Sequence, residues 1–208
     1  MEEKILFKSG ELELEGILEK NSGDTGVVIT HPHPLYGGDM YNPVVGVIAN
    51  AYRDKGYSTL RFNFRGTGES GGKHDNGIGE QEDLLSAISC MHERGITHID
   101  LSGYSFGTFV NAGAVGKGAR VLNMTMVSPP VAFMEFGKLT PLSCLKLVIT
   151  GRYDEVAPVE LVKKTLFQWN SEARLEVIEG TDHFYAGCLK ELEQVLSGFI
   201  TQCNNKKS

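Results

Sequence analysis

A serine, an aspartate and a histidine, far apart along the chain, have the residue types and local settings of a nucleophilic catalytic triad. Ser105 is the centre of the pentapeptide 103–107, Gly-Tyr-Ser-Phe-Gly, which lies between a strand-like run and a segment of small residues typical of a helix. A G-x-S-x-G turn in that setting holds the serine hydroxyl exposed above a sheet. Because Gly and Ser are also common in ordinary turns, the partners of Ser105 decide whether it is a nucleophile.

A serine hydroxyl needs a general base, and the base needs a carboxylate that orients it. Asp154 follows the strand-like run 145–150, and His183 follows the run 174–178. Since the carboxyl ends of parallel strands form one rim of a sheet, we expect Ser105, Asp154 and His183 to converge there. Glu155 and Asp182 are the alternative acids. Asp182 directly precedes His183, which is a poor geometry for bonding the imidazole Nδ1, and we therefore favour Asp154.

Strand-like and helix-like segments alternate along the chain, with no repeat or linker between them. Residues 12–18 alternate like a half-exposed strand, and residues 26–30 and 121–127 resemble buried strands. Apolar spacing predicts helices over 43–55, 80–94, 159–170 and 189–200, and their apolar stripes are typical of core faces. These patterns predict one α/β domain over residues 1–208, with a mostly parallel sheet that starts antiparallel.

Several segments together resemble the α/β hydrolase superfamily, in particular the small uncapped bacterial hydrolases related to dienelactone hydrolase. The matching segments are His31-Pro32-His33-Pro34-Leu35-Tyr36-Gly37-Gly38, the run 61–70 (RFNFRGTGES), the run 76–80 (NGIGE), the elbow at Ser105, and Thr181-Asp182-His183-Phe184. The order Ser, Asp, His along the chain is also that of this superfamily. The resemblance implies the α/β hydrolase fold, with helices on both faces of the sheet and no cap domain.

The resemblance also implies an oxyanion hole made of two backbone N–H groups. One belongs to Phe106, which follows the nucleophile. The other is assigned to His33, since residues 31–34 resemble the His-Gly-x-Pro segment of many relatives, although Pro32 stands where glycine is usual. A zinc site on His31 and His33 is the alternative, but no further Cys or His pair at ligand spacing completes it.

Three residues are candidates for substrate binding. Tyr104 adjoins the nucleophile, and Phe133 and Phe136 lie in the short segment where larger relatives insert a lid. Too few residues separate the strands near 127 and 145 for a helical lid, so we expect an open site. The apolar segment can equally pack as core cover or form a homodimer contact.

The run 66–71, Gly-Thr-Gly-Glu-Ser-Gly, spells the dinucleotide-binding fingerprint G-x-G-x-x-G after a strand-like run. That fingerprint requires a helix to open within the glycine run, whereas residues 72–77 are typical of further loop. We therefore predict no nucleotide cofactor and interpret the run as a structured loop near the catalytic rim, held by Arg65 and Glu69.

The composition limits the expected binding partners and the expected cellular compartment. The 208 residues are 41% hydrophobic and 22% charged with a net charge of −6, which gives no electrostatic reason to expect nucleic acid or an anionic membrane. The charged start predicts no secretory signal or membrane span, and four scattered cysteines favour free thiols in the cytoplasm. We expect a cytoplasmic serine hydrolase without metal or cofactor, acting on an ester-like bond of a small molecule. A thioesterase, a small peptidase and a non-catalytic binding protein are the alternatives.

Overall fold

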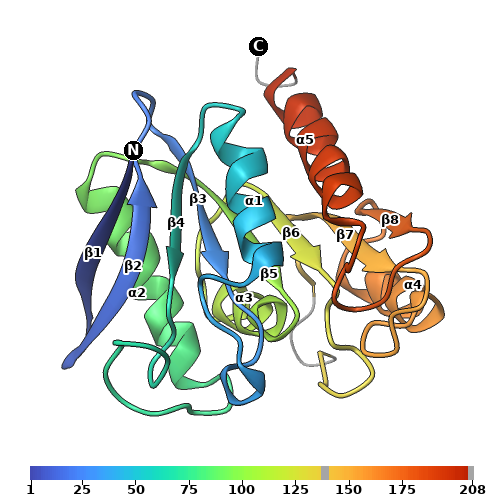
Figure 1. The fold of residues 1–208 in the computed structure, drawn as a ribbon, viewed down its shortest axis with the longest axis horizontal. Helices are drawn as coiled ribbons and strands as arrows, with labels where there is room; N and C mark the ends of the chain where they lie inside the picture. Colours follow the sequence, from blue (N-terminus) through green and yellow to red (C-terminus); the bar gives the residue numbers. More distant parts are fainter. Residues whose placement is uncertain (137–140, 206–208) are drawn as a thin grey trace.

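An eight-stranded sheet forms the centre of the protein, in a computed structural model that describes residues 1–136 and 141–205. Its strand order is β1-β2-β4-β3-β5-β6-β7-β8 (Figure 1). The strands are β1 (Glu2–Ser9), β2 (Leu12–Glu19), β3 (Thr25–Thr30), β4 (Ser58–Phe62), β5 (His98–Tyr104), β6 (Met124–Val127), β7 (Leu145–Gly151) and β8 (Arg174–Ile178).

The sheet changes from antiparallel to parallel pairing at β4. β2 pairs antiparallel with both β1 and β4, whereas β4, β3, β5, β6, β7 and β8 pair in parallel. The carboxyl ends of six strands therefore lie along one rim. This rim receives the segments that follow residues 30, 104, 127, 151 and 178, and it brings distant parts of the chain together.

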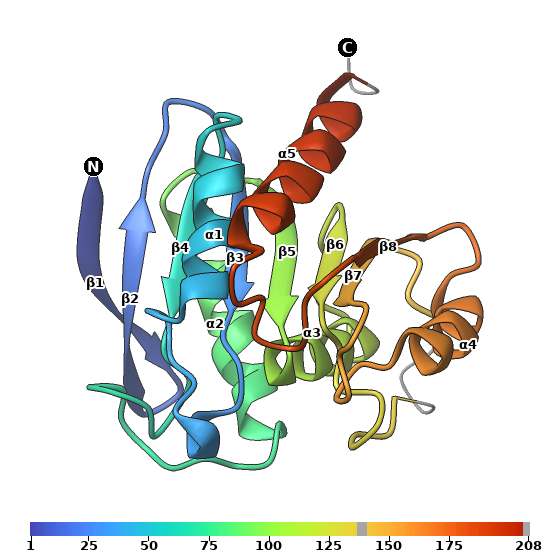
Figure 2. The ribbon, with the colours of Figure 1, turned by 45° about the vertical axis from the view of Figure 1, so that its right-hand side comes forward.

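Helices cover both faces of the sheet (Figures 1 and 2). α1 (Pro43–Arg53) and α5 (Leu189–Asn205) pack on one face, and α2 (Gly79–Glu93), α3 (Phe106–Gly116) and α4 (Val159–Trp169) pack on the other. A short 3-10 helix, η1, spans Pro34–Tyr36. Successive residues of a strand point to opposite faces, and so Val27 and Ile29 of β3 join the α1 and α5 side while Val28 joins the other.

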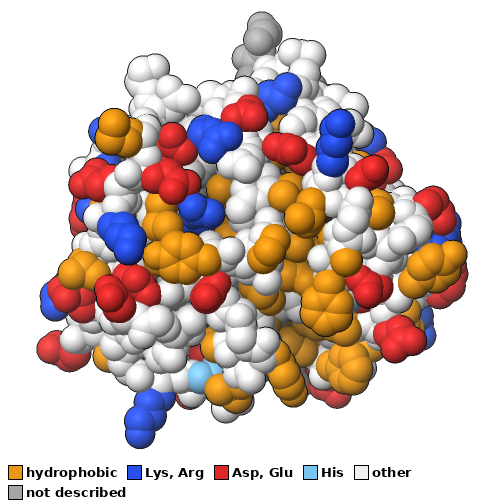
Figure 3. Space-filling model, in the orientation of Figure 1, with side chains coloured by type: hydrophobic (Ala, Val, Ile, Leu, Met, Phe, Trp, Pro, Cys, Tyr) orange, Lys and Arg blue, Asp and Glu red, His pale blue; other side chains and the backbone are white. Residues whose placement is uncertain are grey.

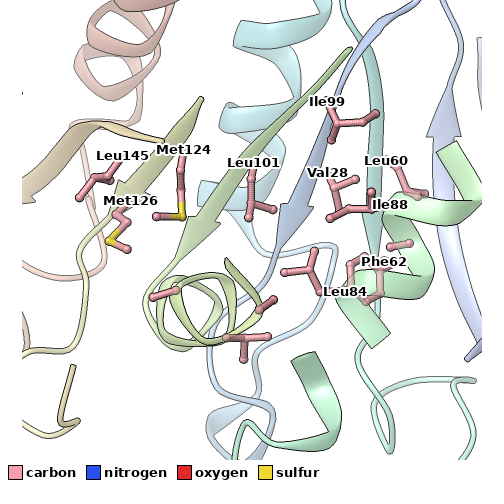
Figure 4. Close-up of a cluster of buried hydrophobic side chains, with 14 of the residues drawn as sticks. Val28, Leu60, Phe62, Leu84, Ile88, Ile99, Leu101, Met124, Met126 and Leu145 are labelled. Carbon is pink, nitrogen blue, oxygen red and sulfur yellow. The ribbon is translucent and has the colours of Figure 1, made fainter. Parts of the chain in front are cut away.

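The larger core lies between the sheet and α2, α3 and α4. Figure 4 shows side chains of β3, β4 and β5 near Leu84 and Ile88 of α2, and side chains of β6 and β7 farther along the same core. Val28, Leu60, Leu101 and Met124 have no exposed surface in it. A central sheet buried on both faces is rigid, and it fixes the positions at which its carboxyl ends deliver polar residues.

The predicted fold class is confirmed, with a few differences in the bounds of the elements. The amino-terminal region forms two strands, β1 and β2, rather than one. β6 starts at Met124 instead of residue 121, and its pairing with β7 shifts register between Met124 and Thr125. α5 runs on to Asn205, five residues past the predicted end. Between β6 and β7 the described residues contain no helix, in agreement with the expected absence of a cap.

Candidate active site

Ser105 lies in a strained turn between β5 and α3. Its backbone has φ 52° and ψ −120°, a conformation that few non-glycine residues adopt. A Cβ on Gly107 would come within 2.5 Å of Thr30 Oγ1 and 2.7 Å of the Thr30 carbonyl oxygen, and one on Gly103 would come within 2.6 Å of Thr30 Oγ1. Both glycines are therefore required by close approach to the end of β3, and the turn holds Ser105 at the rim.

The structure brings Ser105, His183 and Asp154 into one hydrogen-bonded chain. His183 Nε2 lies 3.0 Å from Ser105 Oγ, and His183 Nδ1 lies 3.0 Å from each carboxylate oxygen of Asp154. All three residues are at most 9% exposed. With Nδ1–H donating to Asp154, Nε2 carries a lone pair that faces the serine hydroxyl, as a general base requires.

The alternative acids lie elsewhere. Asp182 uses Oδ1 to accept a hydrogen bond from the backbone N–H of Phe184, and Glu155 is exposed. Asp154 Oδ1, by contrast, also accepts the N–H groups of Val156 and Ala157 at 2.9 and 2.7 Å. The loop after β7 thus holds the Asp154 carboxylate toward His183.

The electrostatic setting favours an ionised Asp154. Burial acts to raise the pKa of its carboxyl, but hydrogen bonding and charge from His183, together with hydrogen bonds from Ser128 and Ala157, lower that pKa below its ordinary value. A carboxylate that stays charged holds the imidazole in the Nδ1–H tautomer and stabilises the imidazolium formed when Nε2 takes a proton.

A buried pair that sequence reasoning missed, Ser128 and Tyr185, contacts the triad through a hydrogen bond from Ser128 to Asp154. Ser128 and Tyr185 both have positive φ, 48° and 56°, and their hydroxyl oxygens lie 2.8 Å apart. Both residues are fully buried. Ser128 directly follows β6, and this position at the rim was the one signal in the sequence that pointed to it. Tyr185 had none, because its role depends on a turn after His183 that no local pattern specifies.

The two backbone N–H groups predicted for the oxyanion hole have no acceptor among the described residues. Phe106 is the first residue of α3, so its N–H has no acceptor in a preceding turn, and the helix dipole favours negative charge there. The N–H of His33 makes no hydrogen bond among the described residues. The rings of His33 and Phe106 stack with centroids 4.7 Å apart, and His33 Nδ1 accepts the N–H of Leu35. The side chains of the two predicted oxyanion residues are thus in contact.

His31 is a structural histidine. Its Nδ1 donates to the Pro32 carbonyl at 2.6 Å, and its Nε2 accepts the N–H of Phe64 at 3.1 Å. Complete burial lowers the pKa of its imidazole from 6.5 to about 4, so that the ring is neutral. With both ring nitrogens occupied, His31 has no lone pair for a metal. The described residues contain no cluster of His, Cys, Asp or Glu that could hold one.

A cleft of about 600 Å³ opens beside Ser105. It is lined by residues that follow the carboxyl ends of β3, β6, β7 and β8, together with Tyr104 and Phe106. Phe133 lines this cleft and is 76% exposed. Tyr104 also lines the cleft, and its hydroxyl donates to the His183 carbonyl at 2.8 Å. Tyr36 and Phe184 also line the cleft and were not predicted.

The prediction that Phe136 contacts substrate is wrong. Phe136 is 2% exposed, and its ring packs against Phe109 of α3 and Trp169 of α4. It does not line the cleft. Phe136 thus belongs to the larger core, between α3 and α4.

The glycine-rich run 66–71 is a structured loop, and the helix after it starts only at Gly79. Arg65 and Glu69 both anchor this loop, each through an acidic residue of another element. Arg65 pairs with the buried Asp83, whose Oδ1 lies 2.8 Å from Arg65 Nη2. The N–H of Glu69 donates to the Glu15 carboxylate at 2.7 Å. The loop thus depends on acids of β2 and α2, and no helix N-terminus opens within it for a phosphate.

Comparisons with known proteins identify the family of the fold. No family model matches the chain. An uncharacterised protein of Rickettsia prowazekii is 30% identical over an alignment of 212 positions. The alignment covers 95% of this chain and 88% of that protein. The solved structure of an α/β serine hydrolase homologue from Coxiella burnetii is 37% identical, with a TM-score of 0.87 over 94% of this chain and 95% of that one. The chain belongs to the α/β hydrolase superfamily.

Its place among the uncapped members follows from a second structure. A lidless α/β serine hydrolase from Xanthomonas campestris is 27% identical, with a TM-score of 0.87 over 97% of this chain and 94% of that chain. The protein described here is thus an uncapped α/β hydrolase. No helix in its described residues has the length and apolar character needed to cross a membrane.

Proposed function

We propose that this α/β hydrolase is a serine esterase that cleaves a carboxylic ester through an acyl-enzyme intermediate. The observation that carries the proposal is the continuous chain from Ser105 Oγ through His183 to Asp154, with 3.0 Å at each step. These distances allow proton transfer and orientation of the base without rearrangement.

In the first half-reaction, Ser105 Oγ attacks the ester carbonyl carbon while His183 Nε2 takes the hydroxyl proton. The tetrahedral intermediate places its negative oxygen at the N–H groups of Phe106 and His33. When the intermediate collapses, the bond to the alcohol oxygen breaks, and His183 gives its proton to that oxygen. The products of this step are the free alcohol and an ester of Ser105.

In the second half-reaction, water takes the place of the alcohol. His183 removes a proton from the water, and the resulting hydroxide attacks the acyl carbon. Collapse of the second tetrahedral intermediate breaks the bond to Ser105 Oγ, which recovers the proton from His183 and releases the acid. Asp154 keeps the Nδ1–H tautomer throughout and stays ionised.

Labelling by a fluorophosphonate probe and an activity screen over esters, thioesters and amides test this proposal. We expect stoichiometric labelling of Ser105, a burst of alcohol release, and turnover of esters ahead of amides. Ser105→Ala should abolish labelling and burst together. Turnover by Ser105→Ala at the wild-type rate would refute the mechanism, and a wild-type protein that neither labels nor turns over would favour a binding protein on the hydrolase fold.

We also propose the cytoplasm as the place of action. No disulfide bond forms among the described residues, which is usual for a protein of a reducing compartment. Fractionation of cells that produce the protein tests this location.

A further inference from the structure

Three aromatic side chains from three separate loops stand at the mouth of the cleft. Tyr36 follows β3, Phe133 follows β6, and Phe184 follows β8, and their side chains are 88%, 76% and 71% exposed. Hydrophobic side chains gather over the lower centre and right of the face in Figure 3, toward the carboxyl ends of the parallel strands. Covering exposed aromatic rings with an apolar ligand group lowers the free energy of the complex.

The cleft carries no fixed charge. None of its lining residues is Lys, Arg, Asp or Glu. Among the described residues, the charged sequence neighbours of the lining residues are all acidic, namely Asp39, Glu135, Glu155 and Asp182. Arg152 comes close in sequence, but its guanidinium is paired with Glu179. Among the described residues, the lining therefore offers an anionic substrate no cation, and the acids next to it in sequence add negative charge nearby.

These two observations specify the substrate further. We propose that the cleft binds an uncharged ester whose aromatic or bulky apolar group packs against Tyr36, Phe133 and Phe184. Its uncharged lining, together with the four flanking acids (the acidic rim), discriminates against anionic substrates. This inference rests on the proposed esterase function. On this proposal, coenzyme A thioesters and esters with a free carboxylate are poor substrates, because their negative charges are repelled.

Three matched substrates isolate the effect of charge. The three substrates are 4-nitrophenyl esters of adipic acid with the same carbon chain. Their other end is a methyl ester, a primary amide or a free carboxylate. At low ionic strength we expect kcat/KM for the amide to exceed that for the carboxylate by roughly tenfold, with a smaller ratio in 0.5 M salt because the ions screen the rim. The amide controls for polarity without charge. Equal values for amide and carboxylate, or a faster carboxylate, would overturn the exclusion of anions.

Alanine variants test the aromatic contacts. Tyr36→Ala, Phe133→Ala and Phe184→Ala should each lower the ratio of kcat/KM for 4-nitrophenyl 3-phenylpropanoate to that for 4-nitrophenyl acetate, by roughly three- to tenfold. Phe167→Ala is the matched control, because Phe167 is 78% exposed on α4 and does not line the cleft. If the ratio falls as much in the control, or in none of the three variants, the aromatic rings do not bind substrate.

A binding measurement separates this inference from the proposed reaction. Calorimetry with the Ser105→Ala protein, which needs no turnover, should show methyl 3-phenylpropanoate binding at least tenfold more tightly than the 3-phenylpropanoate anion. A missing difference refutes the inference even if Ser105 is the nucleophile. Conversely, the expected difference in a wild-type protein that does not label with fluorophosphonate would refute the esterase and leave the binding site standing.

Discussion

The carboxylate of Glu80 and the imidazole of His74 form a buried pair behind the oxyanion loop, with 2.8 Å between Glu80 Oε1 and His74 Nδ1. Neither ring nitrogen of His74 completes a hydrogen bond of good geometry among the described residues. The ring instead packs against both predicted oxyanion residues, with centroids 4.8 Å from His33 and 5.5 Å from Phe106. Glu80 is fully buried and accepts the N–H groups of Asp75 and Gly77 at 2.8 Å each.

This arrangement predicts that His74→Ala lowers kcat by roughly ten- to a hundredfold, because a small displacement of oxyanion donors is costly. KM should change little, since the donors act mainly on the transition state. Steady-state kinetics with a neutral ester checks the split between kcat and KM. His98→Ala is the control, because His98 is exposed and pairs with Asp24 away from the cleft. A rise in KM at constant kcat would instead place His74 in substrate binding.

The assignment of the acid is tested by three substitutions. Asp154→Asn should lower kcat by about 10⁴, because an amide stabilises the wrong imidazole tautomer. Asp182→Asn and Glu155→Gln should leave kcat within a small factor of the wild-type value, since neither side chain reaches His183. Circular dichroism controls for folding of the three variants. If Asp182→Asn lost the activity and Asp154→Asn kept it, the acid would be Asp182.

Much of this site could be predicted because its residues sit at strand ends. The bounds of β8 match the predicted run 174–178, and the rule that parallel strands share a carboxyl rim was enough to group Ser105, Asp154 and His183. The sequence could not decide between Phe133 and Phe136. Both are apolar and three residues apart in a loop, and contact with Trp169, more than thirty residues later, buries only the second.

Local sequence patterns also did not predict which residues pair with the buried charged side chains. Arg65 and Glu69 were expected to hold the glycine-rich loop, but their partners, Asp83 of α2 and Glu15 of β2, come from the fold. Asp83 also accepts the hydroxyl of Ser9 from β1 at 2.8 Å. Such pairings depend on how α2 packs on the sheet, and neither propensity nor apolar spacing encodes that register.

The turn 103–107 approaches β3 so closely that one added methyl group should destabilise the protein. Gly107→Ala should destabilise the protein by about 1–3 kcal/mol, because the new Cβ would collide with the backbone of Thr30. It should also lower kcat, since Thr30 leads directly into the loop that carries His33. Gly198→Ala is a matched control in α5, where a Cβ meets no atom within 4 Å. That change should stabilise the protein by roughly 0.5–1 kcal/mol.

Urea unfolding of both variants measures these opposite changes in the free energy of unfolding. A Gly107→Ala protein as stable and as active as wild type would show that β3 can move away from the elbow. A destabilising Gly198→Ala would show that α5 packs more tightly at that position than the described contacts allow.

The last prediction concerns the pH dependence of stability and follows from His31. Burial lowers the pKa of its imidazole from 6.5 to about 4 in the folded protein, so between these values the unfolded chain binds a proton that the native state does not. Stability from a neutral His31 is therefore complete above pH 6.5 and is lost as the pH falls toward 4. The loss should reach about 2 kcal/mol between pH 7 and pH 5.

Urea titrations across this pH range, on wild type and on His31→Asn, isolate the contribution, because the carboxylates titrate alike in both proteins. We expect the free energy of unfolding of wild type to fall more steeply with acid than that of the variant. The variant should be less stable at pH 7, where it loses the hydrogen bonds that His31 makes to Pro32 and Phe64. Parallel pH profiles in the two proteins would mean that the folded state protonates His31 as readily as the unfolded chain, and that the loop before His33 opens to water.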